Sequence, residues 1–278
     1  MNSLLVKFVS CLVLAAIPVG VLPNPGAAGR NFLSEHARTT ALRVMTYNIH
    51  VGFGMDKKLD LRRISEVILR DSPDLVALQE VDRGVRRTNG LDEIAELARL
   101  TRMDYAFAPN LDFQGGKYGV AVLSRYPILA IDHRRYANKR ESERRGFIRV
   151  EMMVKGRKIN FVTTHLDYQF ADGRLFETEQ LLKALESVEG PLIVTGDFND
   201  EPTGASYKLM LSNFTDAWSD AMSGAGGGLT YPADKPVKRI DYVFVGKSRG
   251  VSAKGAAVRS TLASDHLPLV VDLELVLR

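Results

Sequence analysis

Cysteine is almost absent from this chain of 278 residues, since Cys11 is the only one. It lies within the apolar run "FVSCLVLAAIPVGVL" near the N-terminus. A chain cleaved after this run would contain no thiol, which excludes disulfides, thiolate-bound zinc and a cysteine nucleophile. The candidate site residues described below contain neither the serine–histidine pairing context of a nucleophile elbow nor histidines at the helical spacing of zinc proteases.

The apolar run is typical of an export signal. "MNSLLVK" precedes it with a positive charge, and "NPGAAG" follows it with small residues that suit cleavage after Ala28. The run is shorter than the roughly 20 apolar residues of a membrane span. We therefore expect residues 1–28 to be an export signal or an uncleaved N-terminal anchor, and the protein to be periplasmic or secreted.

The remaining composition is that of a soluble globular protein. Hydrophobic residues make up 45% of the chain and charged residues 25%, which excludes the disordered and fibrous classes. The formal net charge of +4 suits an anionic substrate. No Pro- or Ser-rich linker divides the chain. We predict a polar lead-in over residues 29–41 and one domain over residues 42–278.

Helical and extended patterns alternate along this domain. Apolar residues at helical spacing predict helices over residues 59–72, 90–101 and 173–190, and apolar or β-branched runs predict strands between them. Several connections are too short for helical crossovers, and "KGR" at residues 155–157 is typical of a hairpin turn. The pattern therefore predicts an α/β fold with mixed sheets.

Polar side chains recur where the predicted strands end. In "TGDFND", residues 195–200, two aspartates and an asparagine follow a buried strand. A turn explains each such residue taken singly, because Asp and Asn bond their own backbone. Recurrence at six strand ends points instead to a ligand site, since ligands gather beyond strand ends in α/β folds. The set is Asn48, His50, Glu80, Asp82, His165, Asp167, Asp197, Asn199, Asp241, Asp265 and His266.

The side chains in this set suit hydrolysis of a phosphoester with the help of a hard metal ion. Mg²⁺ prefers oxygen ligands, and Glu80 with Asn48 would supply a carboxylate and an amide oxygen. Asp197 would orient or deprotonate the attacking water, and Asn199 would hold the water or a phosphate oxygen. Histidines would stabilise charge that develops on phosphate, and Asp241 would orient one of them.

Seven segments in order resemble the endonuclease/exonuclease/phosphatase superfamily, to which deoxyribonuclease I belongs. They are "TYNIH", "LQEVD", "YGVAVLSRYPI", "TTHLD", "GDFND", "RIDYVFV" and "SDHLPLVVDL". The resemblance runs from about Leu42 to the C-terminus. It implies a two-sheet mixed β-sandwich flanked by helices, in four layers.

The resemblance also implies a role for each matched residue. It implies Mg²⁺, or alternatively Mn²⁺, at Asn48, Glu80 and Asp265. The implied phosphate-binding residues are Arg145, His165 and Asn199, and the implied catalytic residues are His165, Asp197, Asn199, Asp241 and His266. Family members differ in whether the aspartate at Asp197 or the His266–Asp241 pair is the base. Two residues depart from the family pattern: His50 stands where some members have an acidic residue, and Val120 where close relatives have Asn.

Three functions remain open at this point. The leading hypothesis is an exported Mg²⁺-dependent phosphodiesterase or phosphatase. The "TYNIHVGFG" and "LQEVDRGVRRTNG" stretches resemble the C-terminal domain of proteins linked to glycosylphosphatidylinositol remodelling, so the expected substrates include a phospholipid or a lipid-linked phosphodiester, with the protein at a membrane surface. The basic stretch of residues 133–149 leaves a nuclease acting on DNA or RNA as the alternative, although most such runs are solvated loops. A catalytically silent binding module of the same fold is the third.

Overall fold

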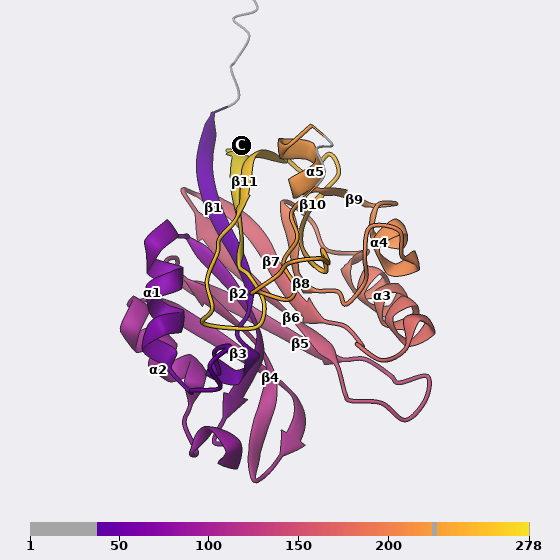
Figure 1. Ribbon diagram of the computed structural model, residues 1–278. Coiled ribbons are helices and arrows are strands. Elements are labelled where there is room, and N and C mark those ends of the chain that lie inside the picture. The colour runs from indigo at the N-terminus through magenta and orange to yellow at the C-terminus, as the bar shows by residue number, and fades with distance from the viewer. Residues whose placement is uncertain (1–37, 224–226, 278) are drawn as a thin grey trace, which may run out of the picture. The chain divides into compact units, whose positions relative to one another are not determined.

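The computed structural model describes residues 38–223 and 227–277 (Figure 1). The predicted export segment, residues 1–28, lies outside this part of the chain, as does most of the lead-in. The first strand begins at Thr39, ahead of the boundary predicted at residue 42. Among the described residues, no helix has both the length and the apolar character that crossing a membrane requires.

Twelve strands form two six-stranded sheets. The first sheet contains, in spatial order, β11 (Val251–Val258), β12 (Leu269–Val276), β1 (Thr39–Asn48), β2 (Leu75–Arg83), β4 (Gly116–Ser124) and β3 (Asp104–Phe113). The second contains β5 (Ile128–Arg135), β6 (Gly146–Val154), β7 (Arg157–His165), β8 (Leu192–Asp197), β10 (Asp241–Gly246) and β9 (Phe214–Asp216).

Each sheet has one parallel pair of strands at its centre. β1 runs parallel to β2, and β7 runs parallel to β8, whereas the other pairs are antiparallel. The prediction of mixed sheets is therefore confirmed. A parallel pair needs a crossover connection, and both crossovers contain a helix. The helices are α1 (Leu61–Asp71), α2 (Glu93–Thr101), α3 (Ala171–Leu185), α4 (Ala205–Met210) and α5 (Ala217–Ala221), with short 3₁₀ turns η1 (His50–Gly52) and η2 (Arg86–Thr88).

The two sheets pack face to face, with helices outside them (Figure 1). One apolar cluster lies between the sheets and includes Val44, Val122, Val150 and Phe161. A second cluster joins α1 and α2 to the outer face of the first sheet, and a third joins α3 and α4 to the outer face of the second sheet. This arrangement is the four-layer sandwich that the sequence predicted.

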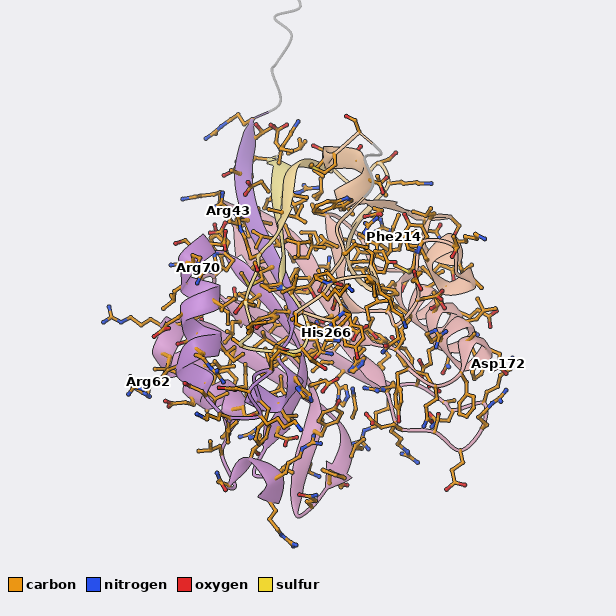
Figure 2. All side chains as sticks on the ribbon, viewed as in Figure 1. Arg43, Arg62, Arg70, Asp172, Phe214 and His266 are labelled. Carbon is orange, nitrogen blue, oxygen red and sulfur yellow. The ribbon has the colours of Figure 1, made fainter. Side chains whose placement is uncertain are left out.

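The amphipathic pattern of α1 shows why its residues form a helix on the first sheet. Ile64 and Ile68 are fully buried against that sheet, whereas Arg62 and Arg70 point outward (Figure 2). Asp60 caps the N-terminus, because its side chain accepts hydrogen bonds from the backbone N–H groups of the first turn.

The apolar and β-branched runs of the sequence do not indicate the strands β3, β9 and β11. β3 contains Pro109 and a register shift before Leu111, and β11 contains Gly255 and a register shift after Ala253. Proline and glycine weaken a strand pattern, and a bulge interrupts its alternation. Pairing with neighbouring strands, which a local pattern does not contain, determines these elements.

Phe161 provides a test of the packing between the sheets, since its side chain is fully buried there. We expect Phe161→Ala to lower the free energy of unfolding by about 3–5 kcal/mol, because it removes apolar contacts and leaves a cavity. Leu129→Ala, at a position that is 56% exposed, should cost less than about 0.5 kcal/mol. Urea denaturation of both variants measures the difference, and equal losses would contradict this packing.

Candidate active site

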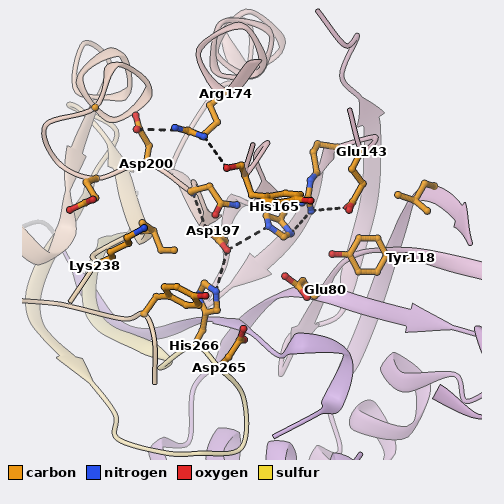
Figure 3. A pocket seen from close by; sticks show the side chains of 18 of the residues that line it. Glu80, Tyr118, Glu143, His165, Arg174, Asp197, Asp200, Lys238, Asp265 and His266 are labelled. Atoms are coloured by element: carbon orange, nitrogen blue, oxygen red, sulfur yellow. Dashed lines mark hydrogen bonds and ion pairs between the residues drawn. The ribbon is translucent and has the colours of Figure 1, made fainter. Parts of the chain in front are cut away.

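The predicted polar residues meet in one pocket at the edge of the sandwich (Figure 3). Three of them do not follow a strand as predicted: Asp241 begins β10, and Asp265 and His266 precede β12. The pocket has a volume of about 770 Å³. Seven of the residues proposed from the sequence line it, namely Glu80, Arg145, His165, Asp197, Asn199, Asp265 and His266. Asn48 and Asp241 lie behind this lining and contact it through hydrogen bonds.

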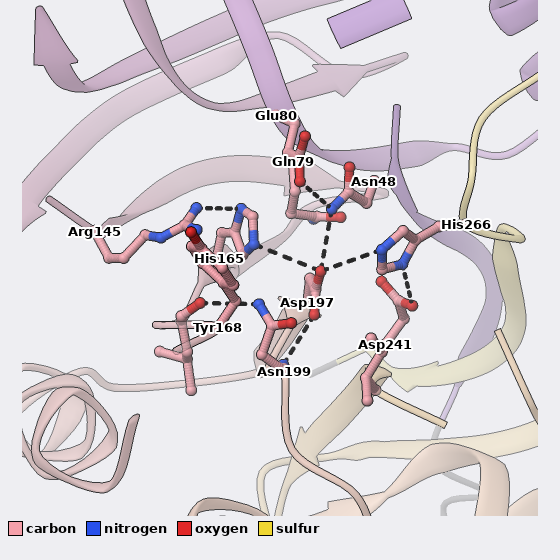
Figure 4. Close-up of polar contacts among 12 residues, drawn as sticks. Asn48, Gln79, Glu80, Arg145, His165, Tyr168, Asp197, Asn199, Asp241 and His266 are labelled. Atoms are coloured by element: carbon pink, nitrogen blue, oxygen red, sulfur yellow. Dashed lines mark hydrogen bonds and ion pairs between the residues drawn. The ribbon is translucent and has the colours of Figure 1, made fainter. Parts of the chain in front are cut away.

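The carboxylate of Asp197 lies at the centre of the polar contacts (Figure 4). Its Oδ2 atom accepts a hydrogen bond of 3.1 Å from Asn48 Nδ2, and it lies 3.5 Å from His165 Nε2 and 3.7 Å from His266 Nε2. Its Oδ1 atom accepts the backbone N–H of Asn199 at 2.9 Å. Burial and the nearby Asp241 carboxylate raise the pKa of Asp197 well above the ordinary range of an aspartate.

The local backbone of "TGDFND" explains how Asp197 reaches this position. Gly196 has φ of +140°, and a Cβ atom there would lie 2.0 Å from the carbonyl oxygen of Thr164 on β7. Only glycine lets β8 approach β7 so closely. Asn199 has φ of +48°, a left-handed conformation that Asn tolerates, and its Nδ2 donates to the carbonyl of Leu166. The segment is therefore both a strand-end turn and one wall of the pocket.

His165 is held as a neutral imidazole by Arg145. The Nη1 atom of Arg145 lies 2.7 Å from His165 Nδ1, and a guanidinium only donates, so Nδ1 is the acceptor and the proton is on Nε2. Burial and the positive charge of Arg145 lower the pKa of His165 well below its usual value. The Nε2–H group consequently points toward Asp197 as a fixed donor. Glu143 balances the buried guanidinium at 3.1 Å.

His266 has the opposite protonation state. Its Nδ1 atom donates to Asp241 Oδ2 at 2.9 Å. Burial alone would lower its pKa, but the carboxylates of Asp241 and Asp197 outweigh burial and raise the pKa of His266 to about 10. At neutral pH it is therefore an imidazolium that carries a proton on both ring nitrogens, with Nε2 3.7 Å from Asp197 Oδ2. The ring of Tyr231 covers it, with ring centroids 4.8 Å apart.

Asn48, Glu80 and Asp265 form the carboxylate-rich side of the site. Glu80 lies where the pairing of β2 with β4 shifts register, and its φ is +55°. Asn48 Nδ2 donates to Glu80 Oε1 at 3.0 Å, and Asn48 Oδ1 accepts the backbone N–H of His50 at 3.0 Å. Within residues 38–223 and 227–277, no Lys, Arg or His forms an ion pair with Glu80. The two carboxylates with an adjacent amide fit a divalent cation, because hard cations prefer oxygen donors.

A tighter acidic group lies next to these residues. One ligand atom from each of Asp197, Asp241 and His266 falls within 4.8 Å of the others. In this group the His266 cation already lies between the two carboxylates and bonds to one of them. The group of Asp197, Asp241 and His266 is thus suited to proton transfer. Glu80 and Asp265, which present carboxylates toward the pocket, are the better candidates for metal binding.

Two strand-end acids have structural roles only. Asp167 Oδ1 accepts the backbone N–H groups of Gln169 and Phe170 before α3. Asp82 accepts two hydrogen bonds from Arg87, at 2.7 Å and 2.9 Å. For these two residues the turn or pairing explanation is sufficient.

Several residues that support the site carry no clear signal in the sequence. Gln79 on β2 donates to Thr163 on β7 at 2.8 Å and so joins the two sheets behind the site. Tyr118 lines the pocket, and burial raises its pKa well above the usual value, so it stays a phenol. Glu93 accepts the backbone N–H of Asp82, and Glu177 accepts that of Asp167, each at 2.7 Å. These glutamates appear in the sequence as ordinary members of amphipathic helices.

Glu93 makes the fold depend on pH. Burial raises the pKa of Glu93 from 4.5 to about 8. The protonated carboxyl therefore stabilises the folded chain below pH 4.5, and this contribution is lost as pH rises to about 8. Glu93→Gln has no carboxyl to titrate at this position. As pH rises from 4.5 to 9, the unfolding free energy of the variant minus that of the wild type should therefore increase by on the order of 3 kcal/mol, as measured with urea. Glu179→Gln, at an exposed position on α3, should leave the dependence unchanged, and parallel curves for Glu93→Gln would contradict the assignment.

Comparisons with known proteins agree with this arrangement. An Escherichia coli protein of uncharacterised function, YbhP, is 28% identical over 258 residues, which cover 87% of this chain and all of the relative. A Bacteroides thetaiotaomicron endonuclease/exonuclease/phosphatase family protein superposes with a TM-score of 0.74 at 18% identity, covering 86% of this chain and 100% of that one. The mannosyl-6-phosphatase of the same organism superposes with a TM-score of 0.69 at 18% identity, covering 84% and 99%. At these identities, the two structures share the fold.

The sequence signature of the endonuclease/exonuclease/phosphatase family matches residues 45–266, which span the strands and side chains of the site. Members typically depend on a divalent metal ion. This chain therefore belongs to the endonuclease/exonuclease/phosphatase family, whose members are generally hydrolases that act on phosphoester bonds.

Proposed function

We propose that this protein is an exported, Mg²⁺-dependent phosphodiesterase, with Mn²⁺ able to occupy the same site. The observation that carries the proposal is the convergence of Asn48, His165 and His266 on the buried Asp197 carboxylate. Such an arrangement brings a proton acceptor and two fixed N–H donors to one point of the pocket. A phosphate group needs both beside it when water attacks phosphorus.

The donors would hold the non-bridging oxygens of the phosphate. His165 would donate from Nε2 as a neutral imidazole, and His266 would donate from Nε2 as an imidazolium. One hydrogen of Asn199 Nδ2 is used on the carbonyl of Leu166, which leaves the second for a phosphate oxygen. Arg145 would act mainly through His165, because it bonds to that ring at 2.7 Å, and would add positive charge behind the phosphate.

Asp197 is the better candidate for the general base. His266 is already protonated at neutral pH, since its pKa is about 10, and so it is unable to accept a proton. Burial and Asp241 raise the pKa of Asp197 toward neutrality, where a base is most effective. Asp197 would take the proton of the attacking water as the oxygen bonds to phosphorus. The ester bond on the opposite side would then break, and the leaving oxygen would take a proton from a solvent water molecule to become an alcohol.

Glu80 and Asp265, together with Asn48, would hold the metal ion. When bound, the metal would supply positive charge that stabilises the phosphate and the leaving oxygen. Asn48 Nδ2 keeps the Glu80 carboxylate in place through a bond of 3.0 Å. Asn48 also bonds to Asp197, so it would couple the position of the base to that of the metal ligand.

The pairing of the basic residues favours a lipid or lipid-linked phosphodiester over a nucleic acid. In the stretch of residues 133–149, four of the seven Arg and Lys residues, Arg134, Arg140, Arg145 and Arg149, each lie within 4.0 Å of a carboxylate. Within the described residues, only Arg135, Lys139 and Arg144 of this stretch form no ion pair, which leaves three free cations. A nucleic-acid track needs cations that are free to neutralise successive phosphates. An exported protein retained near a membrane by residues 1–28 would meet phospholipids there. A nuclease acting on DNA or RNA is the alternative, which a substrate panel separates.

The first test of the proposal is hydrolysis of bis(p-nitrophenyl) phosphate by the full chain with Mg²⁺ and with excess chelator. We expect activity that the chelator abolishes. Asp197→Asn and His266→Ala should each lower kcat by about 10²–10⁴-fold, because each removes a group that acts in the transition state. His133→Asn, on β5 outside the pocket, is the matched histidine control and should retain activity.

Full activity in Asp197→Asn at saturating Mg²⁺ would overturn the mechanism. A wild-type chain without activity and without calorimetric Mg²⁺ binding would instead indicate the catalytically silent binding module. If activity is present, phosphatidylinositol vesicles and single- and double-stranded DNA, compared at equal phosphate concentration, decide between the two substrate classes.

The pH dependence of kcat/KM provides a second test. Activity requires Asp197 deprotonated and His266 protonated, so the profile should be bell-shaped, with its alkaline limb near the His266 pKa of about 10 and its acid limb near neutrality. Asp241→Asn removes the charge that raises the pKa of His266, so the alkaline limb should move to lower pH. An alkaline limb that stays in place in this variant would refute the assigned role of Asp241.

A further inference from the structure

We propose that His50 supplies a nitrogen ligand to the metal ion through Nδ1, beside Asp265, so that the site binds Mn²⁺ more tightly relative to Mg²⁺ than a site of oxygen donors alone would. The inference rests on the proposed metal-dependent function and concerns the one strand-end histidine that the mechanism leaves without a role. His50 begins the 3₁₀ turn η1, two residues after the end of β1. Asn48 and Glu80, the residues assigned to the metal, lie on β1 and β2 beside it.

The position of the His50 ring carries the inference. Nδ1 is buried and has no hydrogen-bond partner, although the side chain as a whole is 44% exposed. It lies 3.7 Å from Asp265 Oδ1, which is too long for a hydrogen bond. Two ligand atoms at about 2.1 Å from one ion are separated by roughly 3.0 Å when adjacent and 4.2 Å when opposite. A cation held between the two atoms would therefore satisfy a buried nitrogen that the chain itself leaves unpaired.

The backbone fixes the ring in this position. His50 has φ of +46° and Val51 has φ of +45°, so two consecutive non-glycine residues adopt the left-handed conformation. Such backbone is costly, and it persists at functional sites when the surroundings impose it. Here the Asn48 side chain accepts the His50 N–H at 3.0 Å, so a proposed metal ligand itself holds the turn. The turn therefore directs His50 toward the same site.

The chemistry of imidazole determines which ion is favoured. Mg²⁺ prefers oxygen donors and releases water reluctantly, whereas imidazole nitrogen suits first-row transition metals. His50 beside Asp265 would offer Mn²⁺ one imidazole nitrogen and one carboxylate oxygen, whose ligand atoms lie 3.7 Å apart. An acidic residue at position 50 would give an oxygen-only site that is better matched to Mg²⁺.

The competing explanation is an ion pair between a protonated His50 and Asp265. In that case His50 would oppose cation binding by charge repulsion and would not discriminate between Mg²⁺ and Mn²⁺. The two explanations differ in the ratio of metal affinities, which does not depend on catalysis.

The test is calorimetric titration of the full chain with Mg²⁺ and with Mn²⁺, for the wild type, His50→Asn and His50→Asp. Both replacements tolerate a left-handed backbone, so the turn should be retained. His133→Asn is the control for loss of a histidine elsewhere. We expect the ratio of the Mg²⁺ to the Mn²⁺ dissociation constant to fall by about 10- to 100-fold in both His50 variants and to stay unchanged in the control.

Electron spin-echo spectroscopy of bound Mn²⁺ provides the second readout. The wild type should show coupling to a directly bound ¹⁴N nucleus, and His50→Asn should lose it. Metal binding without nitrogen coupling in the wild type, or an affinity ratio that does not change in the variants, would overturn the inference while the metal-dependent hydrolase remains. Absence of binding by either ion would overturn both.

Discussion

The buried carboxylate of Asp197 is the constraint on which the site depends. A buried charge is costly unless hydrogen bonds and opposite charges surround it, and Asp197 is 1% exposed. Its partners come from β1, from the end of β7, from the turn after β8 and from the segment before β12. The carboxylate thus joins four segments that are distant in the sequence. Loss of one of these partners would leave the buried charge of Asp197 with fewer hydrogen bonds and opposite charges to offset its burial.

The two-sheet architecture brings these partners together. Each sheet has a central parallel pair, so β1 and β2 end at the same edge of one sheet, and β7 and β8 end at the same edge of the other. Gln79 bonds to Thr163 across the sandwich just behind that edge. On each side, a helix glutamate accepts the backbone N–H of a strand-end aspartate. The same kind of hydrogen bond therefore fixes the loop next to the site at the end of β2 in one sheet and at the end of β7 in the other.

Two histidines in one pocket acquire opposite protonation states from their neighbours. Arg145 bonds to His165 and favours the neutral ring, whereas Asp241 bonds to His266 and favours the imidazolium. The contrast gives one neutral donor and one charged donor around the same carboxylate. It also indicates why the base is better assigned to Asp197, because a histidine between two carboxylates keeps its proton at neutral pH. His50, which has neither kind of hydrogen-bonded partner at Nδ1, is consistent with a third role.

The sequence by itself determined the fold class and seven of the residues that line the pocket. Strand-end polar residues such as Asn48 and Asp197 are visible locally, because apolar runs stop at them, and segments such as "GDFND" and "SDH" are specific in combination. Only the tertiary structure decided which of these residues meet: Asp82 and Asp167 bond within their own loops, while Asp197 contacts side chains from other strands. Three further features also needed the structure. They are the protonation states of His165 and His266, the hydrogen bond between Gln79 and Thr163, and the absence of a hydrogen-bond partner at His50 Nδ1. Each depends on burial and on a neighbour remote in sequence, neither of which a local pattern contains.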